Sequence, residues 1–248
     1  MVTVICCYNR KEDLDKMLIS SLQKQTMQYE LILVDNSKRE YTSAAAALND
    51  GAKRANGDIL VFAHQDVVFR NKEALSKMIE RFRTIAQIGD IVGVAGAIAH
   101  NKQKVVVQGT GFNTLISSSF EDDYKEVESI DECVIIMHKE AWQTHPFDVG
   151  ACPSWHFYGV EVSYYARLHG HKAYVVNADV LHESLGNLND LFYKSLITFR
   201  KKYKYYYQYI VTTCIYIDIN PLSKYLQLYA QSIYRKIRKT IKRMIGRG

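Results

Sequence analysis

The most informative absences in this sequence are those of the common nucleotide-binding signatures. No G-x-G-x-x-G follows the first apolar run, which disfavours a nicotinamide- or flavin-dependent enzyme. No G-x-x-x-x-G-K-[ST] occurs either, which disfavours a P-loop protein. Only 3 prolines occur among 248 residues, and no Pro/Gly/Ser-rich linker is visible. We therefore expect one continuous core.

Paired cysteines and long apolar runs are also missing. The 5 cysteines are odd in number and form no C-x-x-C motif, so we interpret them as reduced thiols in a reducing compartment. The N-terminus has no charged segment, apolar segment and cleavage site of the kind that defines a signal peptide. The longest apolar stretch, Tyr205–Ile217, is short of the roughly 20 residues that span a bilayer. These features predict a cytoplasmic protein.

Charge is distributed unevenly along the chain. Residues 190–248 hold 13 Lys/Arg and 2 Asp/Glu, whereas the remainder holds 19 Lys/Arg and 24 Asp/Glu. A mildly acidic body therefore carries a strongly basic extension. Such an extension favours an anionic surface as its partner.

The order of apolar runs and helical patterns predicts an α/β fold. Buried runs at Val2–Cys7, Tyr29–Val34 and Asp58–Ala63 alternate with helical patterns over Lys11–Lys24 and Thr42–Ala55. This alternation indicates a mostly parallel sheet with helices on both faces. Further elements are expected along the rest of the chain: helices at Glu73–Ala86, Val160–Leu168 and Leu222–Ile245, and strands at Ile91–Ile98, Gln103–Ser119, Ile130–Met137 and Lys172–Val176.

Polar residues collect where the first three strands end. They are Tyr8-Asn9-Arg10, Asp35-Asn36-Ser37 and His64-Gln65-Asp66. Because ligands of open parallel sheets bind beyond the carboxyl ends of the strands, these residues predict a nucleotide pocket. Without a phosphate-binding glycine loop, a divalent metal held by carboxylate and imidazole can neutralise a diphosphate.

The same segments resemble a known family. VICCYNR, LILVDNS and AAAALNDGAKRANGDILVFAHQDV are similar to the N-terminal half of family 2 glycosyltransferases with the GT-A fold. IDECVIIMHKEAW and PSWHFYGVEVSYYARLHGHKAYVV resemble the acceptor half of that family. The resemblance covers residues 2–185, and a branch with HQD in place of D-x-D is the most similar.

The resemblance implies roles for donor-binding residues. Asp35 would bind the nucleotide base, with Tyr8 and Asn9 beside it. Asp66, the last acid of the motif, would hold Mn²⁺ or Mg²⁺ between the donor phosphates. His64 replaces the first acid, and its neutral imidazole could bind the metal or a hydroxyl.

The resemblance also implies roles in the second half. Glu161 stands in the family's acid pair, whose first member is Val160 here, and would be the catalytic base. His182 would complete the metal contacts. Asp131 is expected on a strand that passes the donor sugar. Three aromatic residues are candidates for an acceptor wall: Trp155, His156 and Tyr158.

Together these features predict an inverting, metal-dependent transfer of a hexosyl or deoxyhexosyl group from a nucleotide diphosphate sugar to a hydroxyl acceptor. The acceptor would be a glycan or lipid-linked molecule in cell-surface polysaccharide or glycolipid assembly. The absence of Q-x-x-R-W favours single transfers over polymerisation. A non-catalytic binding subunit of the same fold and a nucleotidyltransferase stay open as alternatives.

We expect two parts in the chain. Residues 1–189 would form the GT-A domain, with the nucleotide half at about 1–100 and the acceptor half at about 101–189. Residues 190–248 would form a basic, Tyr-rich helical extension. Isoleucines at 233, 237, 241 and 245 repeat at helical spacing among basic residues, as in a helix lying on the inner face of an anionic membrane. A solvated basic helix or a homodimer contact is the alternative; nucleic acid is not expected because no such module is present.

Overall fold

A mixed seven-stranded sheet forms the centre of the protein in a computed structural model, which describes residues 1–109, 122–183 and 188–245, with side chains to 240. Its order is β2-β1-β3-β10-β5-β11-β8. β1, β2, β3, β5 and β11 run in one direction, and β10 and β8 run against them. The expected α/β class is confirmed. The strands of this sheet are Val2–Tyr8 (β1), Glu30–Asp35 (β2), Ile59–Ala63 (β3), Ile91–Gly93 (β5), Tyr124–Val127 (β8), Val134–His138 (β10) and Ala173–Val176 (β11).

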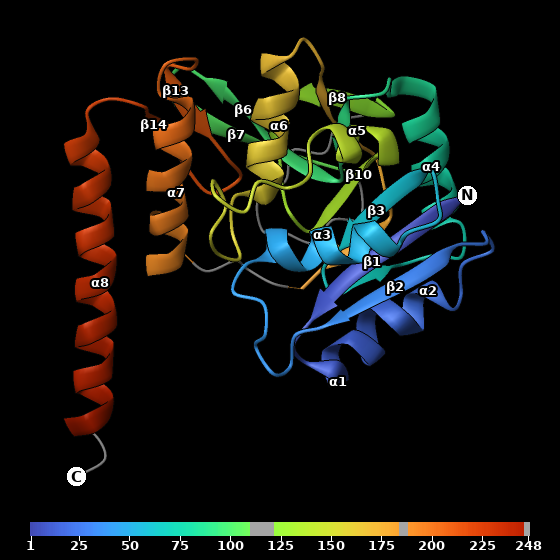
Figure 1. Ribbon diagram of the computed structural model, residues 1–248, viewed down its shortest axis with the longest axis horizontal. Coiled ribbons are helices and arrows are strands. Elements are labelled where there is room, and N and C mark those ends of the chain that lie inside the picture. The colour runs from blue at the N-terminus through green and yellow to red at the C-terminus, as the bar shows by residue number, and fades with distance from the viewer. Residues whose placement is uncertain (110–121, 184–187, 246–248) are drawn as a thin grey trace.

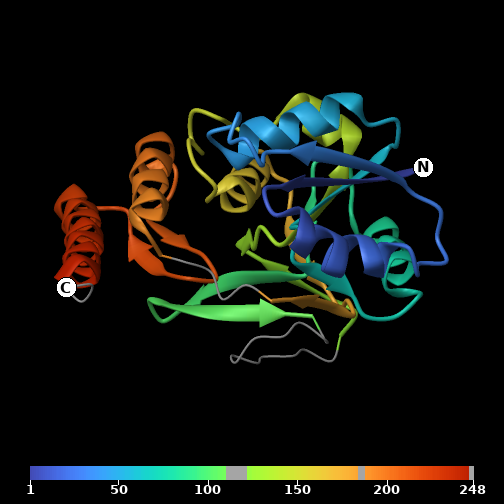
Figure 2. The same cartoon turned by 90° about the horizontal axis from the view of Figure 1, so that it is seen from below.

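Helices cover both faces of the sheet (Figures 1 and 2). One face packs against α3, α5, α6 and α7 (Asp190–Tyr203), and the other against the first helical segment and α4. The β1, β3 and β10 strands are buried because both of their faces are covered. The helices are Lys11–Leu14 (α1), continued by a π-helical turn at Asp15–Ile19 and by Ser20–Leu22 (α2), Ala44–Arg54 (α3), Ala74–Ile85 (α4), Lys139–Thr144 (α5) and Tyr158–Leu168 (α6).

A second, antiparallel sheet, β7-β6-β9, lies against the central one. The expected strand Ile91–Ile98 is in fact two strands, because the chain leaves the central sheet after Gly93 and enters this second sheet as β6. Gly96 allows the crossing, since a Cβ there would lie 2.5 Å from the Ser129 carbonyl oxygen. Of the strand expected at Gln103–Ser119, only Gln103–Gln108 is seen; 110–119 fall outside the described residues. The strands are Ala95–His100 (β6), Gln103–Gln108 (β7) and Ser129–Ile130 (β9).

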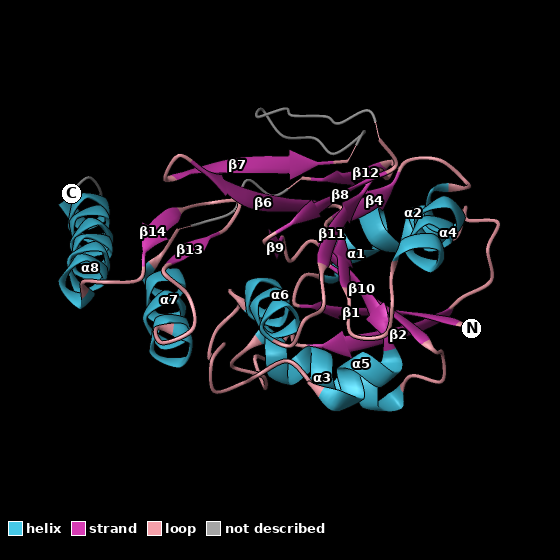
Figure 3. Cartoon of the chain, turned by 90° about the horizontal axis from the view of Figure 1, so that it is seen from above, coloured by secondary structure: helices cyan, strands magenta, loops and turns pink. Residues whose placement is uncertain are grey.

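The basic extension folds as a helix, a hairpin and a second helix. They are Asp190–Tyr203 (α7), the strands Tyr209–Val211 (β13) and Tyr216–Asp218 (β14), and Leu222–Ile245 (α8). α7 buries Phe192, Leu196 and Phe199 in the same hydrophobic core as α6. α8 packs on α7 at the outer edge of the molecule (Figures 1 and 3). Among the described helices, none has the length and apolar character needed to cross a membrane.

Candidate active site

Two short strands bring the predicted metal-binding residues together. β3 ends at Ala63, the HQD segment follows, and β4 (Val67–Phe69) pairs antiparallel with β12 (Val180–His182). In this register His182 lies opposite Val67, next in sequence to Asp66. His182 Nε2 is 3.3 Å from Asp66 Oδ1 and 3.3 Å from His64 Nδ1. The ladder thus assembles a three-residue cluster from segments that are far apart in the sequence.

The His64 imidazole is held from both sides. Its Nε2 is 2.8 Å from the Tyr158 hydroxyl, and its Nδ1 faces the other two members of the cluster. Burial and the neighbouring His182 lower the pKa of His64 to about 4. The ring is therefore neutral at pH 7, which is the form that binds a metal ion.

The three side chains fit a divalent cation. One potential ligand atom from each of His64, Asp66 and His182 lies within 4.8 Å of the others. Burial alone would raise the pKa of the Asp66 carboxyl, but the hydrogen bond from His182 and the nearby His64 hold that pKa below its usual value. Imidazole nitrogens bind divalent first-row metals, and a carboxylate is the ligand type that suits Mn²⁺ and Mg²⁺. The Tyr158 contact fixes the orientation of His64, as an outer partner does for a metal ligand.

A cavity of about 250 Å³ opens beside this cluster. The ends of β1 and β3, helix α3 and the start of α6 line it. Asp35 does not line the cavity but pairs with Tyr8 in the β1–β2 register, where it accepts a hydrogen bond from the Ser37 backbone N–H. The lining includes six predicted site residues: Tyr8, Asn9, His64, Asp66, Trp155 and Tyr158.

Gln65 lines the cavity, although the sequence pattern assigned no role of its own to it. Its Oε1 accepts the backbone N–H groups of Asn9 and Arg10, at 3.0 and 3.1 Å. Its Nε2 donates to Asn9 Oδ1 at 3.2 Å. The middle residue of the HQD segment therefore ties the end of β1 to the end of β3. In the sequence, only its position between two predicted metal ligands, His64 and Asp66, pointed to this role.

Asp131 lies in the turn between β9 and β10, not within a strand as expected. One Asp131 carboxylate oxygen accepts a hydrogen bond within this turn, and the other accepts one from the distant hairpin. Oδ1 accepts from the Cys133 backbone N–H at 3.1 Å, and Oδ2 accepts from the Thr213 hydroxyl at 2.7 Å. A carboxylate oxygen of Asp131 also lies within 4.8 Å of an imidazole nitrogen of His182.

The structure does not bring Glu161 to the cavity. Its side chain is 0% exposed and points between α5, α6 and α7. Lys202 Nζ, the Tyr203 hydroxyl and His145 Nε2 contact its carboxylate at 2.6, 2.7 and 3.1 Å. Although burial opposes it, His145 and Lys202 hold the pKa of Glu161 below its usual value. Its carboxylate is thus fully engaged with protein groups, which the sequence pattern could not show.

Two of the three predicted aromatic acceptor residues, Trp155 and Tyr158, line the cavity, and His156 does not. Trp155 is partly exposed at the cavity, whereas His156 packs its ring against Phe192. Tyr158 is buried, and its hydroxyl also donates to the Glu132 carbonyl at 3.2 Å. Burial and the charge of Asp131 raise the pKa of Glu132 to about 8. Glu132 therefore lies beside two predicted site residues, Asp131 and Tyr158, although the sequence did not single it out.

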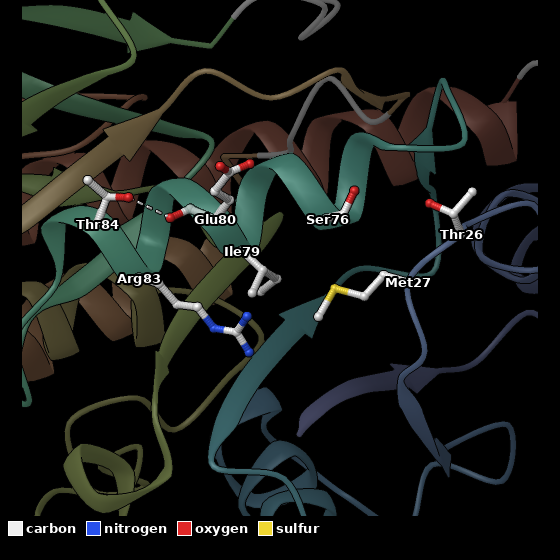
Figure 4. A pocket seen from close by; sticks show the side chains of 7 residues that line it. All are labelled: Thr26, Met27, Ser76, Ile79, Glu80, Arg83 and Thr84. Atoms are coloured by element: carbon white, nitrogen blue, oxygen red, sulfur yellow. Dashed lines mark hydrogen bonds between the residues drawn. The ribbon is translucent and has the colours of Figure 1, made fainter.

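A larger hollow, of about 530 Å³, lies elsewhere on the molecule. It runs along α4 opposite Thr26 and Met27, and within it the Thr84 hydroxyl donates to the Glu80 carbonyl (Figure 4). None of its lining residues is a predicted site residue. Convergent polar groups, and not size, therefore distinguish the smaller cavity.

The fold is similar to that of solved glycosyltransferase structures. TarS residues 1–349 of S. aureus in complex with UDP-GlcNAc are 14% identical, with a TM-score of 0.55 over 94% of this chain and 71% of that chain. The mannosyltransferase PcManGT of Pyrobaculum calidifontis, in complex with GDP-Man and Mn²⁺, is 15% identical, with a TM-score of 0.55 over 82% of this chain and 64% of that chain. GalNAc-T7 with UDP, GalNAc and Mn²⁺ is 12% identical, with a TM-score of 0.57 over 84% of this chain and 50% of that chain.

These similarities define the class: the chain has the GT-A glycosyltransferase fold. The family model described as "Glycosyltransferase like family" matches residues 3–183. The chain therefore belongs to this glycosyltransferase family. No curated protein matches the sequence.

Proposed function

We propose that the protein transfers one sugar at a time, with inversion, from a nucleotide diphosphate sugar to a hydroxyl acceptor, and that it needs Mn²⁺ or Mg²⁺. The observation that carries this proposal is the cluster of His64, Asp66 and His182 beside a cavity at the carboxyl ends of the strands. The hexosyl or deoxyhexosyl donor would lie over Tyr8 and Asn9, with its base towards Asp35.

The reaction needs a carboxylate base, a bound cation and a residue that orients one of the metal ligands. The acceptor hydroxyl oxygen attacks the anomeric carbon, the bond from that carbon to the diphosphate oxygen breaks, and the hydroxyl proton passes to a carboxylate. Asp66, His182 and His64 would hold the cation, which neutralises charge on the departing diphosphate. Tyr158 keeps the His64 ring in place.

Two carboxylates compete for the role of base. Glu161 is the base that the sequence predicts, but Lys202, Tyr203 and His145 enclose it. Asp131 lies beside the cluster and keeps lone pairs that its two hydrogen bonds do not use. We therefore propose Asp131 as the base and regard Glu161 as the alternative. Replacing each with its amide, and comparing transfer with nucleotide binding, separates the two.

The experiment for the whole proposal is a screen of nucleotide sugars by thermal shift, with and without Mn²⁺. A donor should raise the unfolding temperature only when the metal is present, because ligands that bind the native state stabilise it. Incubation of that donor with lipid-linked and glycan acceptors, followed by mass spectrometry, should then show one added sugar. Binding without hydrolysis or transfer would favour the non-catalytic subunit. Release of pyrophosphate from a nucleoside triphosphate would favour the nucleotidyltransferase.

We also propose that α8 holds the enzyme peripherally at the inner face of a membrane, near a lipid-linked acceptor of surface polysaccharide or glycolipid assembly. Leu222, Leu226 and Ile237 are exposed on α8 at 41, 51 and 54%, and Ile233 between them is half-buried. Their spacing places them on one side of the helix. Basic residues on the same helix would attract anionic headgroups. Ile241 and Ile245 of the predicted stripe lie beyond the described side chains.

A further inference from the structure

The hairpin of the basic extension ends in a tightly bonded turn. Thr212 Oγ1 accepts the backbone N–H groups of Cys214 and Ile215, each at 3.0 Å, and the Thr212 N–H donates to the Ile215 carbonyl at 2.8 Å. The Thr213 carbonyl accepts a hydrogen bond from Lys104 of β7. These bonds fix the position of Thr213 relative to the second sheet.

This turn reaches the candidate active site. The Thr213 hydroxyl donates to Asp131 Oδ2 at 2.7 Å, across 82 positions of sequence. The strand before the turn is held as well, since the Ser129 hydroxyl donates to the Val211 carbonyl at 2.8 Å. Figure 3 shows the hairpin between α7 and the β6–β9 edge. A segment outside the residues matched by the family model thus contacts the carboxylate next to the metal-binding cluster.

We propose that Thr213 is a positioning residue for sugar transfer, and that the extension thereby completes the acceptor side of the active site. The inference rests on the proposed function. With Oδ1 bound by the Cys133 N–H and Oδ2 by Thr213, the Asp131 carboxylate has one orientation. Each oxygen still has a lone pair for an acceptor hydroxyl, and the carboxylate stays beside His182.

The bond is not needed to satisfy a buried group. Thr213 is half-buried and its neighbour Cys214 is exposed, so water could replace a lost hydroxyl partner. Loss of the Thr213 hydroxyl should therefore disturb the orientation of Asp131 without unfolding the hairpin, whose turn depends on Thr212. This separation makes the role testable.

The test compares Thr213→Val, which keeps the shape and removes the hydroxyl, with Thr213→Ser, which keeps the hydroxyl. In Thr213→Val, kcat for transfer should fall about tenfold to a hundredfold, as expected for a lost hydrogen bond to a charged group. Thr213→Ser should stay within about threefold of the unsubstituted enzyme. Mn²⁺-dependent nucleotide affinity and unfolding temperature should be unchanged in both. Hydrogen exchange at the Cys133 amide should accelerate in Thr213→Val alone.

Several results would overturn the inference. Unchanged kcat in Thr213→Val would show that the hydroxyl has no part in transfer. Equal losses in both variants would assign the effect to packing, and a loss of nucleotide affinity would place the hairpin on the donor side. Absence of transfer by the unsubstituted enzyme would instead refute the proposed function. In that event the exchange at Cys133 still decides whether Thr213 orients Asp131.

Discussion

At the scale of single residues, the HQD segment combines two different tasks. Its outer members, His64 and Asp66, point towards His182, whereas Gln65 between them bonds the backbone after β1. The segment therefore joins the candidate metal-binding cluster to the strand end that would hold the nucleotide. A change at either outer residue should affect metal binding without loosening the sheet.

Asp66→Asn is the most direct test of the metal-binding cluster. The amide keeps the size of the side chain but removes the negative charge that a divalent cation requires. Calorimetry should show that Mn²⁺-dependent binding of a nucleoside diphosphate is lost, while the unfolding temperature stays close to that of the unsubstituted protein. Asp35→Asn is a matched control at a neighbouring strand end and should keep the metal dependence. If Asp66→Asn binds the nucleoside diphosphate with the same Mn²⁺-dependent affinity as the unsubstituted protein, Asp66 is not a metal ligand.

At the scale of elements, a buried polar cluster joins α7 to the body of the enzyme. Lys202 of α7 bonds both Glu161 of α6 and Asp148, and Tyr203 bonds Glu161 from the next position. Around them lies the aromatic core that α6 and α7 share. This cluster fixes α7, and through α7 it supports the hairpin that follows.

Lys202→Met should destabilise the protein by about 2–4 kcal/mol, because it leaves the Glu161 carboxylate buried with fewer partners. We expect a smaller loss of stability than for a fully buried ion pair, because the Lys202 side chain is itself partly exposed. Urea unfolding measures it. The double variant Lys202→Met, Glu161→Gln should recover part of the loss. Equal stability of the single and double variants would show that the charge on Glu161 carries no cost.

The same cluster predicts a pH dependence of stability. The folded pKa of Glu161 is lowered, so its contribution is fully present above the ordinary glutamate pKa and is lost as the pH falls through the folded value. The difference in unfolding free energy between the unsubstituted protein and Glu161→Gln should therefore be largest near pH 7. It should shrink progressively below about pH 5. If the difference stays constant down to about pH 3, the ionised Glu161 carboxylate does not stabilise the folded protein.

Local sequence patterns predicted the first three strands and the polar residues at their ends because those features depend on neighbouring residues. The contacts of Glu161 cannot be predicted from neighbouring residues. Lys202, one of its partners, lies 41 positions away, in a segment expected to be separate from the body. The same holds for Thr213 and Asp131, 82 positions apart. Sequence pattern therefore predicted the polar strand ends, whereas the surroundings of Glu161 and Asp131 depend on long-range contacts that no periodicity reveals.

At the scale of the whole molecule, α8 lies at the outer edge, where it packs on α7 (Figure 1). Tyr225 is buried near its start, and Lys236 pairs with Asp190 at 3.0 Å. Leu226 and Ile237 are left facing outward. This exposed side is available either to a membrane or to a second copy of the chain.

Full-length protein should sediment with anionic vesicles, detach as salt is raised, and ignore neutral vesicles, because each basic residue near the surface contributes about 1 kcal/mol. A chain ending near Asn220 should stay in solution and still bind nucleotide, since α7 and the hairpin are retained. A variant with Leu226 and Ile237 changed to serine is a matched control that keeps the charge and should bind less. Equal sedimentation of all three would refute the proposal, and a smaller oligomer for the variants without lipid would support a dimer contact.

The position of the hairpin also bears on how such an enzyme can be re-engineered. The extension that supplies α8 also supplies Thr213, so one continuous segment carries both the helix proposed to bind a membrane and the residue proposed to orient Asp131. In a chimera that exchanges residues 190–248 with those of a relative, acceptor preference should travel with the exchanged segment while donor preference stays behind. Membrane location and acceptor specificity would then both be determined by this one segment.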